Sequence, residues 1–343
     1  MPEPTLFLLL SVVAFAVAFD FVNGFHDAAN SIATIVATRV LSPFRAVLWA
    51  ATFNFAAVFV FDTGVAKMVG NGMVAQEFVT LTVILAGLMG ATGWGITTWW
   101  FKLPTSSSHA LLGAYAGAAI TNYALQHGWE HSLSVILWSG WGKTLLFIFL
   151  APTLGLLLGG VVMKTVMLLT AKIPHEKSDK SFAALQLLSS AFLSLTHGGN
   201  DAQKTAGIIT GALLTYGAVD HFVIPTWVLV LSYGTMAFGT LCGGWRIVDT
   251  LGQQLTRLRP PGGFCAEVSA ASSILLATLL KLPVSTTHVT TGAILGTGAA
   301  RNVGAVRWNI AGNILIAWVI TIPAAAMLGG AILALLRPHF ATP

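Results

Sequence analysis

Charged side chains are scarce in this sequence. Asp, Glu, Lys and Arg make up only 8% of its 343 residues, whereas 55% of the residues are hydrophobic. Soluble domains carry roughly 25% charged residues, so this composition excludes an ordinary water-soluble protein and indicates a chain surrounded mostly by lipid. The formal net charge is +5, but the cations lie in short segments between apolar runs, where they set membrane orientation. We therefore expect membrane lipid as a partner and no nucleic acid.

Cysteine is equally scarce. Cys242 and Cys265 are the only two thiols, which is too few for a disulfide framework or a zinc site. The sequence also has no nucleotide-binding motif, so ATP-driven transport by this chain alone is excluded. We expect neither a resident metal nor an organic cofactor. The apolar run that begins at Thr5 has no basic segment before it, which favours a retained membrane span over a signal peptide.

Long apolar stretches are abundant, and a membrane-spanning helix needs about 20 apolar residues. The stretches cover residues 5–40, 45–66, 78–101, 104–123, 139–170, 183–217, 222–244, 264–281, 284–300 and 306–336. This pattern predicts an all-α integral membrane protein with about 10–12 membrane segments. Residues 5–40 are too long for one straight span and residues 264–281 are short, so we expect bent, broken or re-entrant helices in these two places.

The two halves of the chain repeat each other. Phe25-His-Asp-Ala-Ala-Asn-Ser31 resembles Gly199-Asn-Asp-Ala-Gln-Lys-Thr205, and Lys102-Leu-Pro-Thr-Ser-Ser-Ser-His109 resembles Lys281-Leu-Pro-Val-Ser-Thr-Thr-His288. Two matches in the same order, at nearly the same separation, indicate an internal duplication. The predicted divisions are a first repeat over residues 1–170, a charged linker over 171–182 and a second repeat over 183–343.

Each predicted repeat contains an odd number of apolar stretches, which makes the two repeats enter the membrane in opposite directions. Such inverted-topology repeats are typical of secondary transporters. The positive-inside rule places the linker and most basic residues in the cytoplasm and both termini outside a multi-pass inner-membrane protein. The basic residues on the cytoplasmic side are Arg39, Arg45, Lys172, Lys177, Lys180, Arg246, Arg257, Arg259, Arg301 and Arg307.

A polar stripe runs along the first repeated motif. Its residues recur every three or four positions and therefore share one helix face. They are Asp20, Asn23, Asp27, Asn30, Ser31, Thr34 and Thr38, and the second repeat has Ser194, His197, Asp201, Lys204 and Thr205. Carboxylate, amide and hydroxyl oxygens are the ligands of a hard cation, so we predict that Asn23, Asp27, Asn30, Asp201 and Thr205 bind a coupling cation. In the alternative, Asp27 and Asp201 pair with buried donors such as Lys204 and only hold the helices together.

The second repeated motif predicts two helix N-termini inside the membrane. Proline can begin a helix but cannot continue one, and Ser and Thr are good N-caps. Free backbone N–H groups at a helix N-terminus attract anions, so we predict that Ser106, Ser107, Ser108, Ser285, Thr286 and Thr287 bind an oxyanion. Phosphate is mildly favoured over sulfate, because HPO₄²⁻ keeps a proton that it can donate to an Asp. In the alternative, these hydroxyls only cap and pack helices.

The residues of both motifs also resemble the paired signatures of the inorganic phosphate transporter (Pit) family. The resemblance covers nearly the whole chain, and the His26-Asp27 and Gln203-Lys204 variants look most like the bacterial low-affinity branch. It implies uptake of inorganic phosphate, free or as a metal–phosphate complex, driven by a proton or sodium gradient. It also implies a homodimer, a contribution of Asn200 to the cation and phosphate sites, and contacts from Gln203 and Lys204 to phosphate.

The favoured interpretation is a phosphate symporter that works by alternating access, and there are three alternatives to it. The first is a permease of the same fold for sulfate or another oxyanion. The second is an anion channel, although two half-sites that meet near the membrane midplane suit a gated carrier better. The third is an intramembrane hydrolase that uses Ser107 or Ser108 with His109. Adjacent residues on one helix face different directions, so this geometry is poor and we expect no enzyme activity.

Overall fold

The structure is a computed structural model and describes residues 5–340. Its regular elements are helices, and the described residues form no β-strand beyond one isolated bridge between Val74 and Ile136. The main helices form two series of six. The first series is α1 (Leu6–Ala37), α2 (Pro43–Ala56), α3 (Gly64–Asn71), α4 (Leu81–Trp100), α5 (Ser107–His127) and α6 (Trp138–Thr170). The second is α7 (His175–Tyr216), α8 (Thr226–Cys242), α9 (Trp245–Asp249), α10 (Pro260–Leu279), α11 (Thr286–Arg301) and α12 (Trp308–Phe340).

Short helical turns complete the chain between these elements. They are η1 (Ala57–Phe59), η2 (Gln76–Phe78), η3 (Ser132–Val135), η4 (Thr250–Gln254) and η5 (Val303–Ala305). Two pairs of corresponding helices have equal lengths. Both α4 and α10 have 20 residues, and both α6 and α12 have 33 residues with an internal proline, Pro152 or Pro323.

Several helices are long and apolar enough to cross a membrane, as predicted for a multi-pass membrane protein. Within the described residues, five helices pass this criterion alone: α1, α4, α6, α10 and α12. Two bent pairs bring the number to seven, since α2 and η1 meet α3 at 85°, and α8 meets α9 and η4 at 65°. The helices α5, α7 and α11 carry the repeated polar motifs, which lowers their hydropathy, and the motif residues are mostly buried against other helices.

The bends lie elsewhere than the sequence predicts. Residues 6–37 form one uninterrupted helix of 32 residues, about 48 Å long at 1.5 Å per residue. This length exceeds the thickness of the hydrocarbon layer, about 30 Å, and no break interrupts the helix. Residues 264–281 belong to a 20-residue helix that starts earlier, at Pro260. Their length was underestimated because Pro260, Gly262 and Gly263 look like a loop, whereas Pro is well accommodated in the first turn of a helix.

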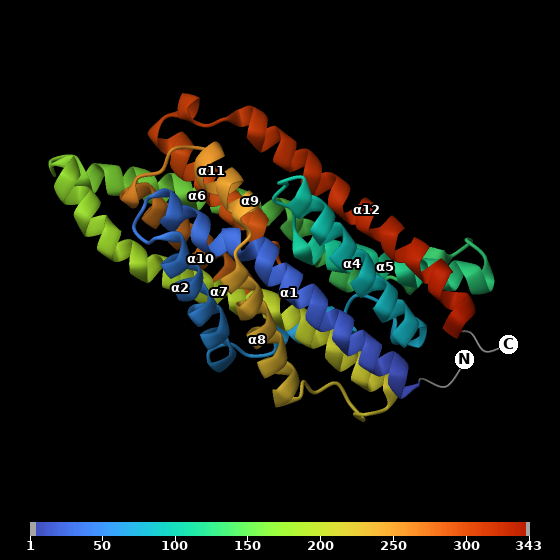
Figure 1. The fold of residues 1–343 in the computed structure, drawn as a ribbon. Coiled ribbons are helices and arrows are strands. Elements are labelled where there is room, and N and C mark those ends of the chain that lie inside the picture. The colour runs from blue at the N-terminus through green and yellow to red at the C-terminus, as the bar shows by residue number, and fades with distance from the viewer. Residues whose placement is uncertain (1–4, 341–343) are drawn as a thin grey trace.

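The connection between the two series lies far from the chain ends. In Figure 1 the N- and C-terminal ends lie close together, and the junction of α6 and α7 lies at the opposite end of the molecule. Much of the predicted linker is helical, because α7 begins at His175 and only residues 171–174 separate it from α6.

The two series interlock through close helix contacts. The helix α5 of the first series packs along α12, and α11 of the second series packs along α6. A Cβ atom on Gly117 would lie 2.1 Å from the carbonyl oxygen of Ala326, and one on Gly296 would lie 1.9 Å from that of Leu156. Glycine lets the backbones approach this closely, as small residues commonly do between membrane helices. These contacts hold α5 and α11, and therefore both helix N-termini, in the centre of the protein.

Candidate functional site

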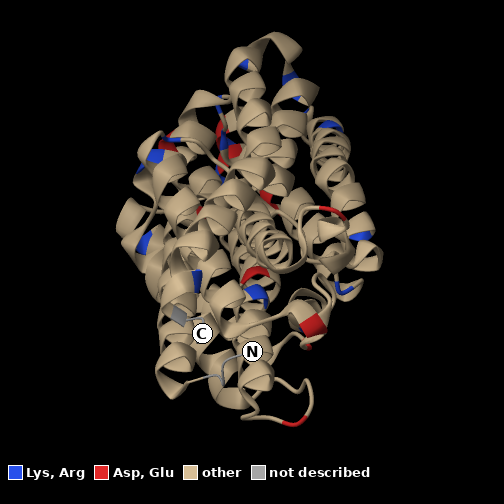
Figure 2. Cartoon of the chain, turned by 90° about the vertical axis from the view of Figure 1, so that its right-hand side faces the viewer, with Lys and Arg blue, Asp and Glu red and all other residues tan. Residues whose placement is uncertain are grey.

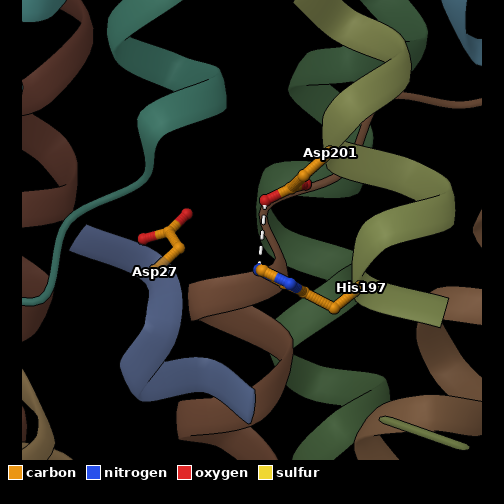
Figure 3. Close-up of side chains that lie close together, drawn as sticks. All are labelled: Asp27, His197 and Asp201. Atoms are coloured by element: carbon orange, nitrogen blue, oxygen red, sulfur yellow. Dashed lines mark ion pairs between the residues drawn. The ribbon is translucent and has the colours of Figure 1, made fainter. Parts of the chain in front are cut away.

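The centre of the molecule contains two carboxylates and an imidazole that face one another. Asp27 comes from α1, and His197 and Asp201 come from α7 (Figure 3). One ligand atom from each of the three residues lies within 4.8 Å of the others, and all three side chains are buried. The Nε2 atom of His197 is 3.4 Å from Oδ2 of Asp201, and its Nδ1 atom is 3.2 Å from Oδ1 of Asn54.

A charged side chain costs roughly 2.5–3.5 kcal/mol at the middle of a membrane helix. Two carboxylates in one buried centre therefore need compensating donors or a cation. The set of two carboxylate oxygens and one imidazole nitrogen is chemically able to bind a cation. His197 lies on the predicted polar stripe but is not among the predicted cation ligands.

The second motif supplies the N-termini of α5 and α11, as predicted. Ser106 is the N-cap of α5, and its Oγ accepts a hydrogen bond from the His109 amide at 3.1 Å. Ser285 is the N-cap of α11, and its Oγ accepts from the His288 amide at 3.2 Å. Both caps are buried, so two positive helix-dipole ends lie inside the protein.

Hydroxyl groups of these N-termini donate to the two carboxylates. Ser107 Oγ is 3.0 Å from Oδ2 of Asp27, and Thr286 Oγ1 is 3.1 Å from Oδ2 of Asp201. These two contacts occupy equivalent positions of the repeat. Thr287 adds a contact between the two series, since its hydroxyl is 3.4 Å from Oδ1 of Asp27. Two of the predicted cation ligands, Asp27 and Asp201, therefore form one continuous centre with three of the predicted oxyanion ligands, which are Ser107, Thr286 and Thr287.

Asn30 and Lys204 complete this centre. The amide nitrogen of Asn30 donates to Thr287 at 3.0 Å and Thr286 at 3.3 Å, while its amide oxygen has no hydrogen-bond partner. The ammonium group of Lys204 contacts the carboxylate of Asp201 and the hydroxyl of Ser108. The alternative pairing of Asp201 with Lys204 is thus present, together with the hydroxyl contacts.

Four predicted site residues take no part in these hydrogen bonds. Asn200 donates to Thr278 at 2.9 Å and to the Leu282 carbonyl at 3.1 Å, which holds the segment that leads into α11. Gln203 accepts from the amides of Val65 and Ala66 at 3.0 and 3.2 Å, at the start of α3. Thr205 donates to Oδ1 of Asp20 at 2.9 Å, and Oδ1 of Asn23 has no partner. The side chains of Asn200, Gln203 and Thr205 thus join neighbouring helices. Asp20 keeps a second carboxylate oxygen without a partner.

A second buried carboxylate network was missed. Glu267 of α10 is fully buried and accepts hydrogen bonds from Thr34 at 2.6 Å, Gln186 at 2.8 Å and Ser189 at 2.5 Å. It joins α10 to α1 and α7. The only signal in the sequence was a single acid in the apolar stretch 264–281, and this signal does not reveal its partners.

Comparison with known proteins assigns the chain to a family. A family model described as the phosphate transporter family matches residues 23–329. The chain belongs to the phosphate transporter family. It is 49% identical over 322 residues to a probable low-affinity inorganic phosphate transporter of Rhizobium meliloti (strain 1021), with 94% of each chain covered. It is also 41% identical to a protein of the same description from Bacillus subtilis (strain 168), covering 94% of this chain and 96% of that one.

A solved structure described as the sodium-dependent phosphate transporter has the same fold. It superposes with a TM-score of 0.83 at 23% identity and covers 97% of this chain and 100% of that chain. The resemblance inferred from the motifs is therefore confirmed. This member of the phosphate transporter family is a multi-pass membrane transporter and not an enzyme.

Proposed function

We propose that the chain is a secondary active transporter that carries inorganic phosphate together with a coupling cation, Na⁺ or H⁺, by alternating access. The observation that carries this proposal is the convergence of Asp27 and Asp201, from equivalent positions of a repeat, on two buried helix N-termini. One centre thus contains the groups that attract a cation and the groups that attract an oxyanion.

The hydrogen bonds suggest how the two ligands depend on each other. In the structure the hydroxyls of Ser107, Thr286 and Thr287 donate to the carboxylates of Asp27 and Asp201. A cation bound to the carboxylates takes over the compensation of their charge. The hydroxyls can then rotate and donate to phosphate, which the N-termini of α5 and α11 also attract. Phosphate binds well only after the cation, and this order is what couples the two fluxes.

The proposed assignment divides the predicted residues into three groups. The cation binds to Asp27, Asn30 and Asp201, with the free amide oxygen of Asn23 as a further ligand, while Asn200 and Thr205 hold the helices that present them. Phosphate binds to hydroxyl and backbone groups of Ser106, Ser107, Ser108, Ser285, Thr286 and Thr287. Gln203 and Lys204 act from α7, Gln203 by fixing the start of α3 and Lys204 by placing a positive charge beside the anion.

Alternating access needs two units that move relative to each other. We propose that the inverted repeats over residues 1–170 and 183–343, joined through residues 171–182, each supply helices to both units, because α5 packs along α12 and α11 packs along α6. The bent pairs α2–α3 and α8–α9 occupy equivalent places in the two series and are the proposed gates. Figure 2 shows most Lys and Arg residues away from the end that carries the termini. This supports an inner-membrane protein with a cytoplasmic α6–α7 junction and external termini.

The test is uptake of radiolabelled phosphate into proteoliposomes that contain the purified protein, with sodium and proton gradients imposed separately. We expect one gradient to drive accumulation above the external concentration, and sulfate to compete weakly, because it has no proton to donate to an Asp. Accumulation of sulfate in place of phosphate would support the alternative oxyanion permease. Equilibration of phosphate without accumulation would support an anion channel and contradict the proposal.

A further inference from the structure

Lys204 occupies the position in the second repeat that Asn30 occupies in the first. Their contacts correspond as well. The amide of Asn30 donates to Oγ1 of Thr287 at 3.0 Å, and the ammonium group of Lys204 donates to Oγ of Ser108. Ser108 and Thr287 are themselves equivalent residues of the second motif. The same contact between the series is therefore made twice, once by a neutral amide and once by a cation.

The ammonium nitrogen of Lys204 is surrounded by oxygen atoms. It contacts the carboxylate of Asp201 and the hydroxyl of Ser108, and it donates to the backbone carbonyl of Val284 at 2.8 Å. The residue is only 3% exposed. A carboxylate, a hydroxyl and a backbone carbonyl are also the oxygen ligands that hard cations take from proteins. An ammonium group on a flexible stem is a compact point charge with three donors, so it satisfies the same ligands as a small monovalent cation.

The first repeat lacks such a charge. Among the described residues, Asp27 forms no ion pair with a Lys or an Arg. Its carboxylate oxygen Oδ1 lies 2.9 Å from Nδ1 of the His26 imidazole. Its oxygens otherwise accept from the neutral hydroxyls of Ser107 and Thr287. The amide oxygen of Asn30, a residue that is 1% exposed, has no partner. The part of the centre around Asp27 and Asn30, called the Asp27 side below, therefore has a carboxylate whose charge no Lys or Arg neutralises and an amide oxygen without a partner.

We infer that Lys204 is a tethered cation, which fills the cation site of the second repeat and leaves the Asp27 side for an exchangeable cation. This inference rests on the proposed function, because it concerns how many cations that function moves. The ammonium group stays with the protein through the cycle, so each phosphate crosses with one fewer mobile positive charge than two equivalent sites would carry. Each charge removed lowers the highest phosphate accumulation by about 50-fold for every 100 mV of membrane potential.

The test replaces Lys204 with the residue of the first repeat. Lys204→Asn removes the ammonium group and supplies an amide oxygen, whereas Lys204→Met removes the charge and supplies no oxygen ligand. The number of charges per phosphate is measured in proteoliposomes from the membrane potential at which net phosphate flux is zero, under fixed sodium and proton gradients. We expect Lys204→Asn to move one more positive charge per phosphate than the unsubstituted protein. An unchanged charge per phosphate in an active Lys204→Asn protein would overturn the inference.

A binding measurement decides the matter if Lys204→Asn does not transport. The thermal unfolding of the protein in detergent is followed over a sodium titration and a pH titration. We expect Lys204→Asn to show a larger saturable, cation-dependent rise in Tm than the unsubstituted protein and Lys204→Met, which keep only the site on the Asp27 side. A rise in Lys204→Asn no larger than in these two proteins would overturn the inference. Failure of the proposed function can be told apart from failure of this inference. If the proposed function is wrong, the unsubstituted protein does not concentrate phosphate under either gradient, and the Tm titration still tests the role of Lys204.

Discussion

At the scale of single residues, the buried carboxylates divide into two kinds. Asp27 and Asp201 lie in the repeated motifs, contact hydroxyls of the two helix N-termini and face each other. Glu267 lies outside the motifs, and its two oxygens accept hydrogen bonds from three residues on two helices, Thr34 of α1 and Gln186 and Ser189 of α7. Asp27 and Asp201 are therefore suited to reversible ion binding. Glu267 is suited to a fixed structural role, because both of its carboxylate oxygens already accept hydrogen bonds from protein groups.

Glu267→Gln tests the structural role. The amide places an N–H₂ group where Thr34, Gln186 and Ser189 now donate, so at least one buried donor loses its acceptor. We expect the free energy of unfolding to fall by about 1–3 kcal/mol, the cost of an unsatisfied buried polar group. Thermal unfolding in detergent measures this loss. Glu176→Gln is the matched control, because its side chain is 81% exposed. Equal Tm values for Glu267→Gln and Glu176→Gln would contradict the structural role of Glu267.

At the scale of helices, the repeated glycines determine how closely α5 and α11 approach their partners. A methyl group at Gly117 or Gly296 would meet a backbone carbonyl at 2.1 or 1.9 Å, and a backbone atom cannot move aside as a side-chain tip can. We expect Gly117→Ala and Gly296→Ala to lower the free energy of unfolding by about 1–3 kcal/mol through overpacking. Phosphate uptake should fall with them, since the helix N-termini shift.

Gly93→Ala is the control for this prediction. It lies in the helix α4, and a Cβ atom there would have nothing within 4 Å. Alanine is favoured over glycine in a helix by up to about 1 kcal/mol, so we expect unchanged or slightly higher thermal stability. Thermal unfolding and uptake assays on the three variants check the prediction. A Gly296→Ala protein as stable and active as Gly93→Ala would show that the close approach is not required.

Helix starts were easier to predict than helix breaks. The caps at Ser106 and Ser285 follow from local chemistry, because Pro and a hydroxyl residue mark a helix N-terminus in a few residues. The bends between α2 and α3 and between α8 and α9 depend on packing against other helices, which a single sequence does not show. The polar stripe predicted Asp27 and Asp201 as site residues. It did not reveal that Gln203 bonds to the start of α3, because this contact also depends on packing between helices.

At the scale of the whole molecule, the repeat and the distribution of charge predict orientation. The α6–α7 junction and the chain ends lie at opposite ends of the molecule (Figure 1). Lys177 is exposed near the junction, and Asp220 is exposed in the segment between α7 and α8. In a Cys242→Ser background, we expect a membrane-impermeant maleimide to label Asp220→Cys but not Lys177→Cys in spheroplasts. Cys265 is buried and serves as an unreactive background thiol. Labelling of Lys177→Cys alone would reverse the orientation.

The central claim is that the paired carboxylates of Asp27 and Asp201 couple a cation to phosphate, and gradient-driven phosphate uptake by their Asn variants tests it most directly. Asp220→Asn is the matched control, because Asp220 is exposed and outside the centre. We predict that Asp27→Asn and Asp201→Asn each lower uptake at least about 10-fold, since an interaction with a charged group contributes about 1.5–3 kcal/mol. The control should keep normal uptake. Folded Asp27→Asn and Asp201→Asn proteins that concentrate phosphate as well as Asp220→Asn would contradict the account.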